Sequence, residues 1–264
     1  RDSVLWEIHD RMMTRAIKPT LTGEVNLLAF KIELAKREIT DCRLCGWECG
    51  VSRFQKAGRC GLLDEAYYSD PFIHIQEEPP ITPAATIKLF GCGLSCIYCQ
   101  AWEHLDVQKG GVEGKKLGQG VWPEIEKASG FPDAVSLEFV GGNPDENIYP
   151  ILKTLQSASP SFKLPVVWNC HLYAMPVLYK LLSGVVDVFL PDFKYSNNKC
   201  GKELSGIDDY WDCAREGLNL MTKLPARIIM RVLILSNHVK CCNLPVIEFL
   251  SKFRERICVS VLDQ

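Results

Sequence analysis

Seven of the thirteen cysteines fall into two closely spaced groups. The first group has the spacing C-x2-C-x3-C-x10-C, and the second has C-x3-C-x2-C. Their members are Cys42, Cys45, Cys49 and Cys60 in the first cysteine group and Cys92, Cys96 and Cys99 in the second. Thiolates at such short spacings are typical metal ligands, whereas disulfide frameworks belong mainly to small secreted domains with an even number of cysteines. We therefore predict that both groups bind metal.

The second cysteine group offers three thiolates, although a closed metal site needs four ligands. A structural zinc ion takes four protein ligands, so zinc here would need a distant His or Cys. In a four-iron cluster, three thiolates leave one iron open to a small molecule. The group directly follows an apolar run at 86–91, so this iron would lie at the C-terminal end of a strand, where β/α barrels carry their chemistry. We predict a 4Fe-4S cluster, with zinc as the alternative.

The first cysteine group can close a site by itself, because it supplies four thiolates within nineteen residues. Zinc and a second iron–sulfur cluster both accept this ligand set, and the spacing does not decide between them. The other six cysteines are expected to be small core residues, an expectation that applies least to Cys170 and the Cys241–Cys242 pair. These six are Cys170, Cys200, Cys213, Cys241, Cys242 and Cys258.

The composition is that of a folded protein without a strong electrostatic partner. The 264 residues include 30 basic and 32 acidic side chains, and 47% are hydrophobic. A net charge of −2 argues against a nucleic-acid or membrane-surface partner. No apolar run approaches the roughly 20 residues of a membrane span, and the segment from Arg1 does not resemble a signal peptide. We therefore expect a cytoplasmic protein.

Apolar periodicity divides the chain at about residue 83. Residues 24–40 have the spacing of an amphipathic helix, and residues 41–83 are rich in Cys, Gly and Pro. The end of that segment, EEPPITP, is expected to be extended because of its prolines. We predict an N-terminal helix with a Cys-rich metal-binding module over residues 1–83, and a second domain over residues 84–264.

Six short apolar runs in residues 84–264 alternate with stretches suited to helices. Several runs are apolar throughout, as expected of strands covered on both faces. The pattern predicts an α/β fold with a parallel sheet, either open or partly closed as a barrel. The Gly- and Lys-rich segment 109–120 is predicted to be a solvated loop, with a lid as the alternative. The runs are residues 86–91, 134–141, 164–170, 185–191, 227–235 and 257–262.

The stretch FGCGLSCIYCQ at 90–100 resembles the signature of the radical S-adenosylmethionine superfamily. Tyr98 matches the aromatic position before the third cysteine of that signature. The resemblance implies a partial (β/α)6 TIM-like barrel and a 4Fe-4S cluster whose free iron binds the amino and carboxylate groups of S-adenosylmethionine. Reductive cleavage of this cofactor then yields methionine and a 5′-deoxyadenosyl radical that abstracts hydrogen from a substrate.

The resemblance also extends to residues that would bind the cofactor. Gly141 and Gly142 match a glycine pair that contacts the methionine amino group, and Asn143 stands where an acidic residue often follows. Asn169 ends the third run and by likeness faces the cofactor or substrate. Arg231 matches an arginine near the ribose and carboxylate of the cofactor. These residues are therefore candidates for cofactor binding.

Asp192 and Lys194 follow the fourth apolar run and are two residues apart, so both side chains should point towards the mouth of the barrel. We predict that they act there on the substrate, together with Asn169. The alternative is a structural ion pair of Asp192 with Lys194 or Arg231. His171 is expected to pack or to hydrogen-bond rather than to act as an acid or base.

Within the superfamily, residues 40–264 resemble the group related to pyruvate formate-lyase activating enzymes. This resemblance implies an electron donor such as flavodoxin or ferredoxin and a protein substrate on which a glycyl radical forms. Proteins of this group usually continue beyond the sixth run, so further chain after Gln264 is expected. Modification of a small metabolite or a nucleic-acid base is the alternative reaction. A non-catalytic zinc-binding interaction module is the alternative class. The stretches that carry the resemblance are EEPPITP, VDVFLPDFKYS, RVLILSNHVKCC and VSVLDQ.

Overall fold

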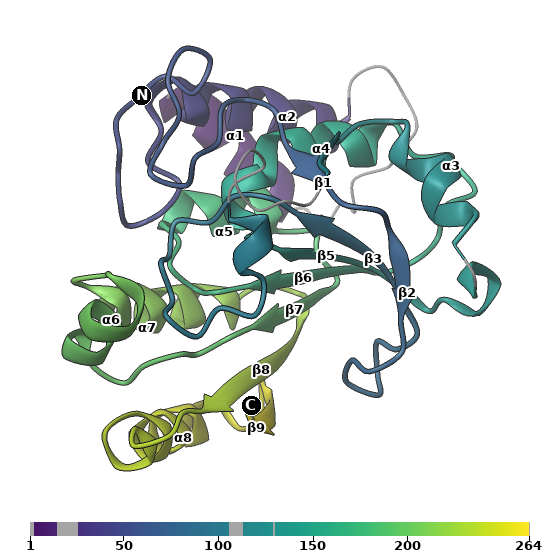
Figure 1. The fold of residues 1–264 in the computed structure, drawn as a ribbon. Helices are drawn as coiled ribbons and strands as arrows, with labels where there is room; N and C mark the ends of the chain where they lie inside the picture. Colours follow the sequence, from purple (N-terminus) through teal and green to yellow (C-terminus); the bar gives the residue numbers. More distant parts are fainter. Residues whose placement is uncertain (1–2, 15–25, 106–112, 129, 264) are drawn as a thin grey trace.

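A nine-stranded, mostly parallel sheet runs through the described part of the chain (Figure 1). The computed structural model describes residues 3–14, 26–105, 113–128 and 130–263. The strands are β1 (Tyr67–Tyr68), β2 (Phe72–His74), β3 (Ala84–Leu89), β4 (Lys115–Lys116), β5 (Ser136–Gly141), β6 (Val166–Cys170), β7 (Val188–Pro191), β8 (Arg227–Ile234) and β9 (Cys258–Asp263). Their order in the sheet is β4-β1-β3-β5-β6-β7-β8-β9, with β2 also paired to β3.

The six predicted apolar runs all form strands, namely β3 and β5 to β9. They pair in parallel and in chain order, so each strand lies beside the one that precedes it in the parallel series. Strands β3 and β7 are almost wholly buried, which explains why their sequences are apolar throughout. The predicted α/β class is confirmed.

Helices connect the parallel strands, as the sequence predicts. In α2 the side chain of Asn26 caps the first turn, where its Oδ1 accepts a 2.8 Å hydrogen bond from the backbone N–H of Ala29. Helix α6 was not anticipated because its sequence, NKCGKELS, is short and mostly polar. The helices are α1 (Ser3–Thr14), α2 (Leu27–Glu38), α3 (Val121–Glu126), α4 (Ile148–Gln156), α5 (Pro176–Leu182), α6 (Asn198–Ser205), α7 (Tyr210–Met221) and α8 (Leu244–Leu250).

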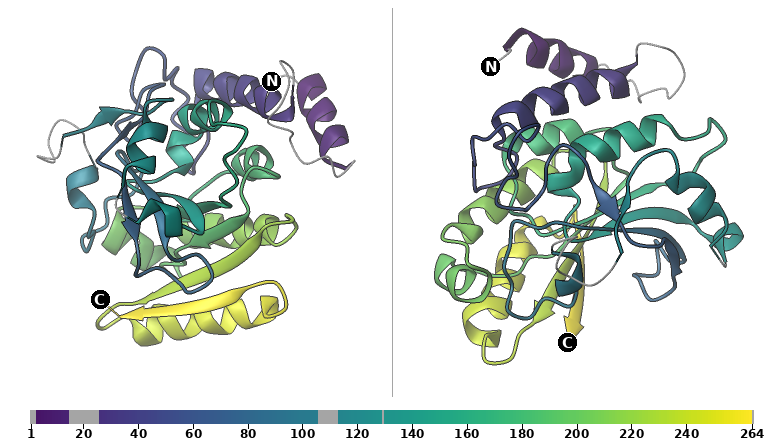
Figure 2. Two further views of the ribbon diagram at one scale, coloured as in Figure 1. Left: turned by 90° about the vertical axis from the view of Figure 1, so that its right-hand side faces the viewer. Right: turned by 45° about the horizontal axis from the view of Figure 1, so that its top comes forward.

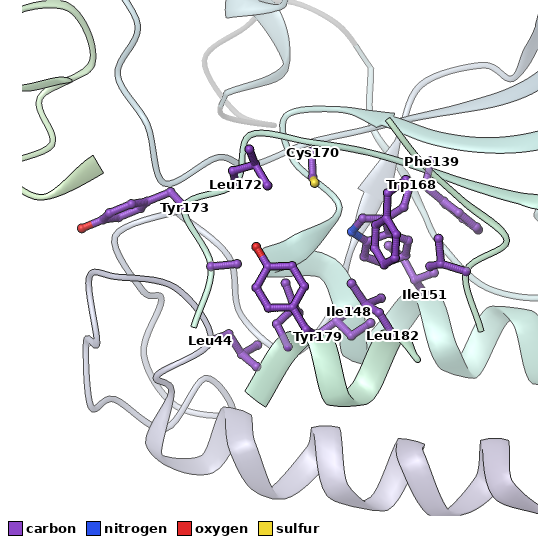
Figure 3. Close-up of a cluster of buried hydrophobic side chains, with 14 of the residues drawn as sticks. Leu44, Phe139, Ile148, Ile151, Trp168, Cys170, Leu172, Tyr173, Tyr179 and Leu182 are labelled. Atoms are coloured by element: carbon purple, nitrogen blue, oxygen red, sulfur yellow. The ribbon is translucent and has the colours of Figure 1, made fainter. Parts of the chain in front are cut away.

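The N-terminal part of the chain packs on the same core as the parallel strands. Helix α2 lies against α4, which separates it from the sheet (Figure 1). Figure 3 shows Leu44, from the Cys-rich segment, in one cluster with Trp168 of β6 and Tyr179 of α5. Strands β1 and β2 also pair with β3 across residue 83. The core is thus continuous across residue 83, and the domain boundary there stays a prediction.

Two segments outside the main strands and helices were also predicted, EEPPITP as an extended segment and residues 109–120 as a loop. The end of the Cys-rich segment turns rather than extending, because the N–H of Ile81 donates a 3.0 Å hydrogen bond to the carbonyl of Glu78. Within the Gly- and Lys-rich segment, residues 109–112 lie outside the described residues. Its remainder contains the short strand β4, which pairs with β1.

The opposite end of the sheet is formed by β8 and β9. Figure 2 shows β9 beside β8 along its whole length, with α8 packed next to the pair. In the described residues, no helix combines the length and apolar character that crossing a membrane requires.

Candidate functional site

A cavity of about 440 Å³ opens where the parallel strands β3, β5, β6 and β7 end and the cysteine loop follows β3. All members of the second cysteine group line it, and so does each residue expected around the cofactor or substrate. These residues are Tyr98, Gly141, Gly142, Asn143, Asn169, Asp192, Lys194 and Arg231. The carboxyl edge of a parallel sheet is the usual place for a ligand site. The structure therefore brings together residues that are up to 139 positions apart in the chain, from Cys92 to Arg231.

The loop of the second cysteine group is fixed by backbone hydrogen bonds to α6. The N–H groups of Ser95 and Ile97 donate to the carbonyls of Ser205 and Leu204, each at 3.0 Å. Cys92, Cys96 and Cys99 are all half-buried residues. Burial raises the pKa of the Cys92 and Cys99 thiols. Three thiols that face one cavity from a single loop fit a cluster that keeps one iron open.

A chain of hydroxyl groups runs behind this loop. The phenol oxygens of Tyr98 and Tyr195 are 2.5 Å apart, and Tyr195 in turn hydrogen-bonds to Ser205. The hydroxyl of Ser205 lies 2.9 Å from the sulfur of Cys96. The aromatic residue of the signature therefore reaches back to a cysteine of its own loop through α6.

The Gly141–Gly142 pair has a structural reason for lacking side chains. A Cβ atom on Gly142 would lie 2.2 Å from the carbonyl oxygen of Gly91, and one on Gly141 would lie 2.7 Å from the backbone of Leu89. Gly141 also has a φ of +93°, which disfavours other residues. The glycines therefore let β5 approach β3 and the cysteine loop closely, and they expose backbone to the cavity at the same point.

Two amides of the site are held by buried carboxylates. Asn169 donates a 2.9 Å hydrogen bond to Glu138, whose pKa burial raises. Asn143 is buried and donates to Glu146. The amide of each asparagine is thus oriented before any ligand arrives.

Asp192 and Lys194 form an ion pair at the cavity wall, with 2.8 Å between Oδ2 and Nζ. Burial is the largest single influence on Lys194 and would lower its pKa, but Asp192, Cys96, Tyr98 and Tyr210 together outweigh it, so the pKa is raised. Lys194 is therefore a fixed cation at the cavity. The Asp192–Lys194 ion pair, which is the alternative to a substrate role, is present. Both residues also line the cavity, as predicted.

Arg231 also has carboxylate partners. Its guanidinium bonds to Glu77 and to both carboxylate oxygens of Glu78, with 2.7 Å from Nε to Oε1 of Glu78. Burial lowers the pKa of Arg231 to about 10, which still leaves it protonated at neutral pH. The link between Arg231 and Asp192 is a backbone bridge rather than an ion pair. Arg231 lines the cavity, but its positive charge is paired with Glu77 and Glu78, which precede β3.

The first cysteine group lies outside this cavity. Its backbone turns tightly, since the N–H of Gly50 donates to the carbonyl of Cys42 and the N–H of Cys42 donates to Val51, both at 2.9 Å. A Cβ on Gly58 would contact the sulfur atoms of both Cys49 and Cys60, at 3.7 and 3.5 Å. Both are ordinary contact distances, so Gly58 marks where these two thiols approach one another, and the metal site stays a prediction.

The two cysteine groups are joined through Trp47 and Glu146. The indole N–H of Trp47, which lies between two cysteines of the first group, donates a 2.8 Å hydrogen bond to the carbonyl of Gly93. The N–H of Gly93 donates at 2.9 Å to Glu146. Glu146 is buried, lies 3.4 Å from His171, and its own carbonyl accepts a 2.5 Å hydrogen bond from Arg53. The segment of the first cysteine group is thus hydrogen-bonded directly to the loop of the second.

Sequence reasoning missed several polar residues of the site. Lys88 and His74 line the cavity, and Glu77 and Glu138 form a close carboxylate–imidazole cluster with His74. A signal was present for two of them, because Lys88 and Glu138 interrupt apolar runs, where an unpaired charge is costly. His74 and Glu77 lie in a segment without periodicity and gave no such signal.

The six remaining cysteines do not all behave as core residues. Cys170 is buried as expected, but Cys241 and Cys258 are exposed, so the core prediction is wrong for these two. Cys200, Cys241 and Cys242 lie together with His238. The core expectation applied least to the Cys241–Cys242 pair, but the role of Cys200 and His238 was not predictable, because α6 brings Cys200 to the cluster from 38 residues before His238.

The fold and the cavity define an α/β protein with a cysteine-lined pocket at the carboxyl edge of its parallel strands. No protein-family model matches the chain. The chain is 34% identical, over 278 aligned positions, to "Uncharacterized protein MJ0674" of Methanocaldococcus jannaschii. The alignment covers 98% of this chain and 78% of that protein. The chain belongs to the same family as MJ0674.

Proposed function

We propose that the protein is a radical S-adenosylmethionine enzyme. One observation carries the proposal: the second cysteine group and the eight residues expected around the cofactor or substrate line a single cavity. When bound, a 4Fe-4S cluster and S-adenosylmethionine would supply reductive cleavage of the sulfonium and a 5′-deoxyadenosyl radical for hydrogen abstraction. Cys92, Cys96 and Cys99 would hold the cluster, each on a different iron.

The chain's own residues would orient the cofactor and substrate. Backbone groups at Gly141 and Gly142 are free to approach an amino group, and Asn143 and Asn169 are already oriented by buried carboxylates. Lys194 offers a fixed positive charge, balanced by Asp192. Arg231 would release or share one of its carboxylate partners to bind an anionic group. The roles of these residues are binding and positioning.

The finer description of the fold belongs to the same proposal. Six parallel strands in chain order, with helices between them, suit a partial (β/α)6 barrel whose mouth is the cavity. The Cys-rich segment would be a metal-binding module that holds zinc or a second cluster. Its four closely spaced cysteines support metal, and zinc and a cluster are both candidates.

The substrate we favour is a protein on which a glycyl radical is generated, with flavodoxin or ferredoxin as electron donor. A small metabolite or a nucleic-acid base is the alternative substrate. The rival from another class is a non-catalytic module that binds zinc at both cysteine groups. The ligand count argues against this rival, because the second group supplies three thiols to an open cavity and not four to a closed site.

The test is anaerobic reconstitution with iron and sulfide, followed by dithionite and S-adenosylmethionine. We expect about four irons per chain, or about eight if the first group also holds a cluster. We also expect release of 5′-deoxyadenosine, and none above background from Cys99→Ala. Zinc alone with no such release would contradict the proposal. Deuterium transfer from labelled candidate substrates into 5′-deoxyadenosine would then separate protein, metabolite and base.

A further inference from the structure

We propose that Cys200, His238, Cys241 and Cys242 bind one zinc ion, at a site separate from both cysteine groups discussed above. The four ligand atoms all lie within 4.8 Å of one another. Cys200 and Cys242 are buried, His238 is half-buried and Cys241 is exposed. We refer to these four residues as the α6 cluster. It is independent of the proposed enzymatic function.

The distances within the α6 cluster are those of a tetrahedral zinc site. The sulfur atoms of Cys200 and Cys241 are 3.8 Å apart, and Nδ1 of His238 lies 3.6 Å from the first and 3.4 Å from the second. Zinc binds sulfur at about 2.3 Å and nitrogen at about 2.0–2.1 Å, so tetrahedral geometry requires roughly 3.8 Å between sulfurs and roughly 3.5 Å from sulfur to nitrogen. Cys200, Cys241 and His238 thus already have the spacing that the ion would impose, and the sulfur of Cys242 lies within 4.8 Å of their ligand atoms.

The local backbone explains how these residues meet. After β8 the chain reverses at Asn237, which has a φ of +66°. Residues Val239–Asn243 then form a single π-helical turn, in which the N–H of Asn243 donates a 3.3 Å hydrogen bond to the carbonyl of His238. A π-helical turn is rare and often marks a functional site. Here it brings two adjacent cysteines and His238 to the first turn of α6.

Neighbouring polar groups orient the ligands, as is usual around bound metals. The side chain of Asn197 accepts a 2.8 Å hydrogen bond from the N–H of Cys200 and donates a 2.9 Å bond to the carbonyl of Cys241. Its amide nitrogen also lies 3.8 Å from the sulfur of Cys242. The hydroxyl of Ser196 donates to the same Cys241 carbonyl at 2.5 Å. The start of α6 is thus tied to the π-helical turn even without the ion.

Four protein ligands fill the coordination of zinc, so this site would be structural. Its position gives it a specific task. Zinc would fix the first turn of α6 to the loop after β8, and the last turn of α6 accepts the backbone hydrogen bonds of Ser95 and Ile97. The ion would therefore support the loop of the second cysteine group from the far end of one short helix.

The test is metal analysis of the protein purified anaerobically without added metal. We expect Cys241→Ser and His238→Ala to contain about one zinc per chain less than the wild type. His238→Cys should keep this zinc, since a fourth thiolate replaces the imidazole. Cys258→Ser is the matched control, because it removes an exposed cysteine outside the cluster and should change nothing. The difference of one zinc is expected whether or not the first cysteine group also holds zinc.

Equal zinc content in the wild type and both ligand variants would overturn the proposal, and so would a disulfide between Cys200 and Cys241. If the ligand variants do not fold, cobalt substitution in the wild type and in His238→Cys gives a second measurement. Replacement of imidazole by thiolate at a bound cobalt should shift its tetrahedral d–d bands. Identical cobalt spectra for the two proteins would contradict binding at His238.

Discussion

The second cysteine group and the α6 cluster contain the same kind of ligand but differ in what surrounds it. The second group presents three half-buried cysteines from one loop to a cavity that also contains Lys194 and Arg231. The α6 cluster gathers four ligands from two segments within 4.8 Å, beside the neutral side chains of Asn197 and Ser196. The second cysteine group leaves room for a ligand, whereas the α6 cluster can supply all four ligands of a metal ion.

The contrast shows that cysteine spacing along the chain reveals only one of the two kinds of site. A local motif predicts a site when one loop supplies all its ligands. A site assembled from α6 and the turn after β8 has its cysteines 41 residues apart and becomes visible only in three dimensions. The following experiments test whether the second cysteine group and the α6 cluster are independent of each other and differ in kind.

The largest effect is expected from Cys96→Ala. Removal of one of three thiolates should eliminate iron from the second cysteine group and reduce release of 5′-deoxyadenosine to background, because no other ligand of the loop can replace it. Zinc bound by the α6 cluster should be retained. Iron, zinc and 5′-deoxyadenosine are measured on the same anaerobic sample, with Cys213→Ala as control. Loss of both metals together would show that the two sites are not independent.

Glu146→Gln should destabilise the protein by about 2 kcal/mol, because a buried carboxylate that accepts hydrogen bonds from Gly93 and Asn143 is replaced by a neutral amide. Burial would raise the pKa of Glu146, but His171 and the hydrogen bond from Asn143 outweigh it and lower the pKa, so the native state favours the charged form. Denaturant unfolding measures the change. The exposed Glu126 gives the control Glu126→Gln, which should stay within about 0.5 kcal/mol of wild type. Equal effects at both positions would refute the role of Glu146.

Arg231→Lys should weaken S-adenosylmethionine binding about tenfold, which corresponds to about 1.4 kcal/mol, while iron content stays unchanged. Lysine keeps the charge but cannot make the forked contact that Arg231 makes with Glu78. The KM for S-adenosylmethionine is the measurement. Arg227→Lys, at the exposed end of the same strand, is the control. An unchanged KM would mean that Arg231 serves only to hold the turn before β3.

The last prediction concerns Lys31, which is remote from both sites. Burial lowers its pKa to about 7, and its ammonium contacts His9 at 2.9 Å and the carbonyl of Lys180 at 2.8 Å. The unfolded chain binds this proton more tightly, so the destabilisation is complete below pH 7 and is relieved as pH rises towards the ordinary value of 10.5. From pH 7 to 9 the wild type should gain about 1–2 kcal/mol relative to Lys31→Met. Denaturant unfolding at each pH measures this, and parallel curves for the two proteins would contradict it. Both metal contents should be unaffected.

Much of the fold was predictable because its signal is local. Continuous apolar runs such as VVDVFLP predict parallel strands, and all six runs form them, although the last one, β9, is largely exposed. The short strands β1, β2 and β4 were not predictable, because two or three residues carry no periodicity. Their pairing depends on distant strands, since β1 and β2 pair with β3 and β4 pairs with β1. Helix α6 was missed because its capping residue Asn197 is its main local signal.

The site was predictable to the extent that a motif or an interrupted strand marks it. Asp192 and Lys194 follow an apolar run, and they do meet at the cavity. The partners of Arg231 were not predictable, because Glu77 lies 154 residues away and only the sheet order brings them together. The Gly141–Gly142 pair was predicted to contact a ligand. The structure shows a second reason for glycine, because a Cβ atom on Gly142 would collide with the backbone of Gly91.

The chain order of the parallel strands has a consequence for synthesis. Each parallel strand after β3 pairs with one that has already been made, so the sheet can grow strand by strand as the chain emerges. His238, Cys241 and Cys242 are made about 40 residues after Cys200, and the α6 cluster therefore closes only after β8 has been made. Until then the start of α6 is held by α7, where the N–H of Trp211 donates a 2.9 Å hydrogen bond to Asn198. Zinc uptake would thus follow the synthesis of β8 and would report that the turn after β8 has reached α6.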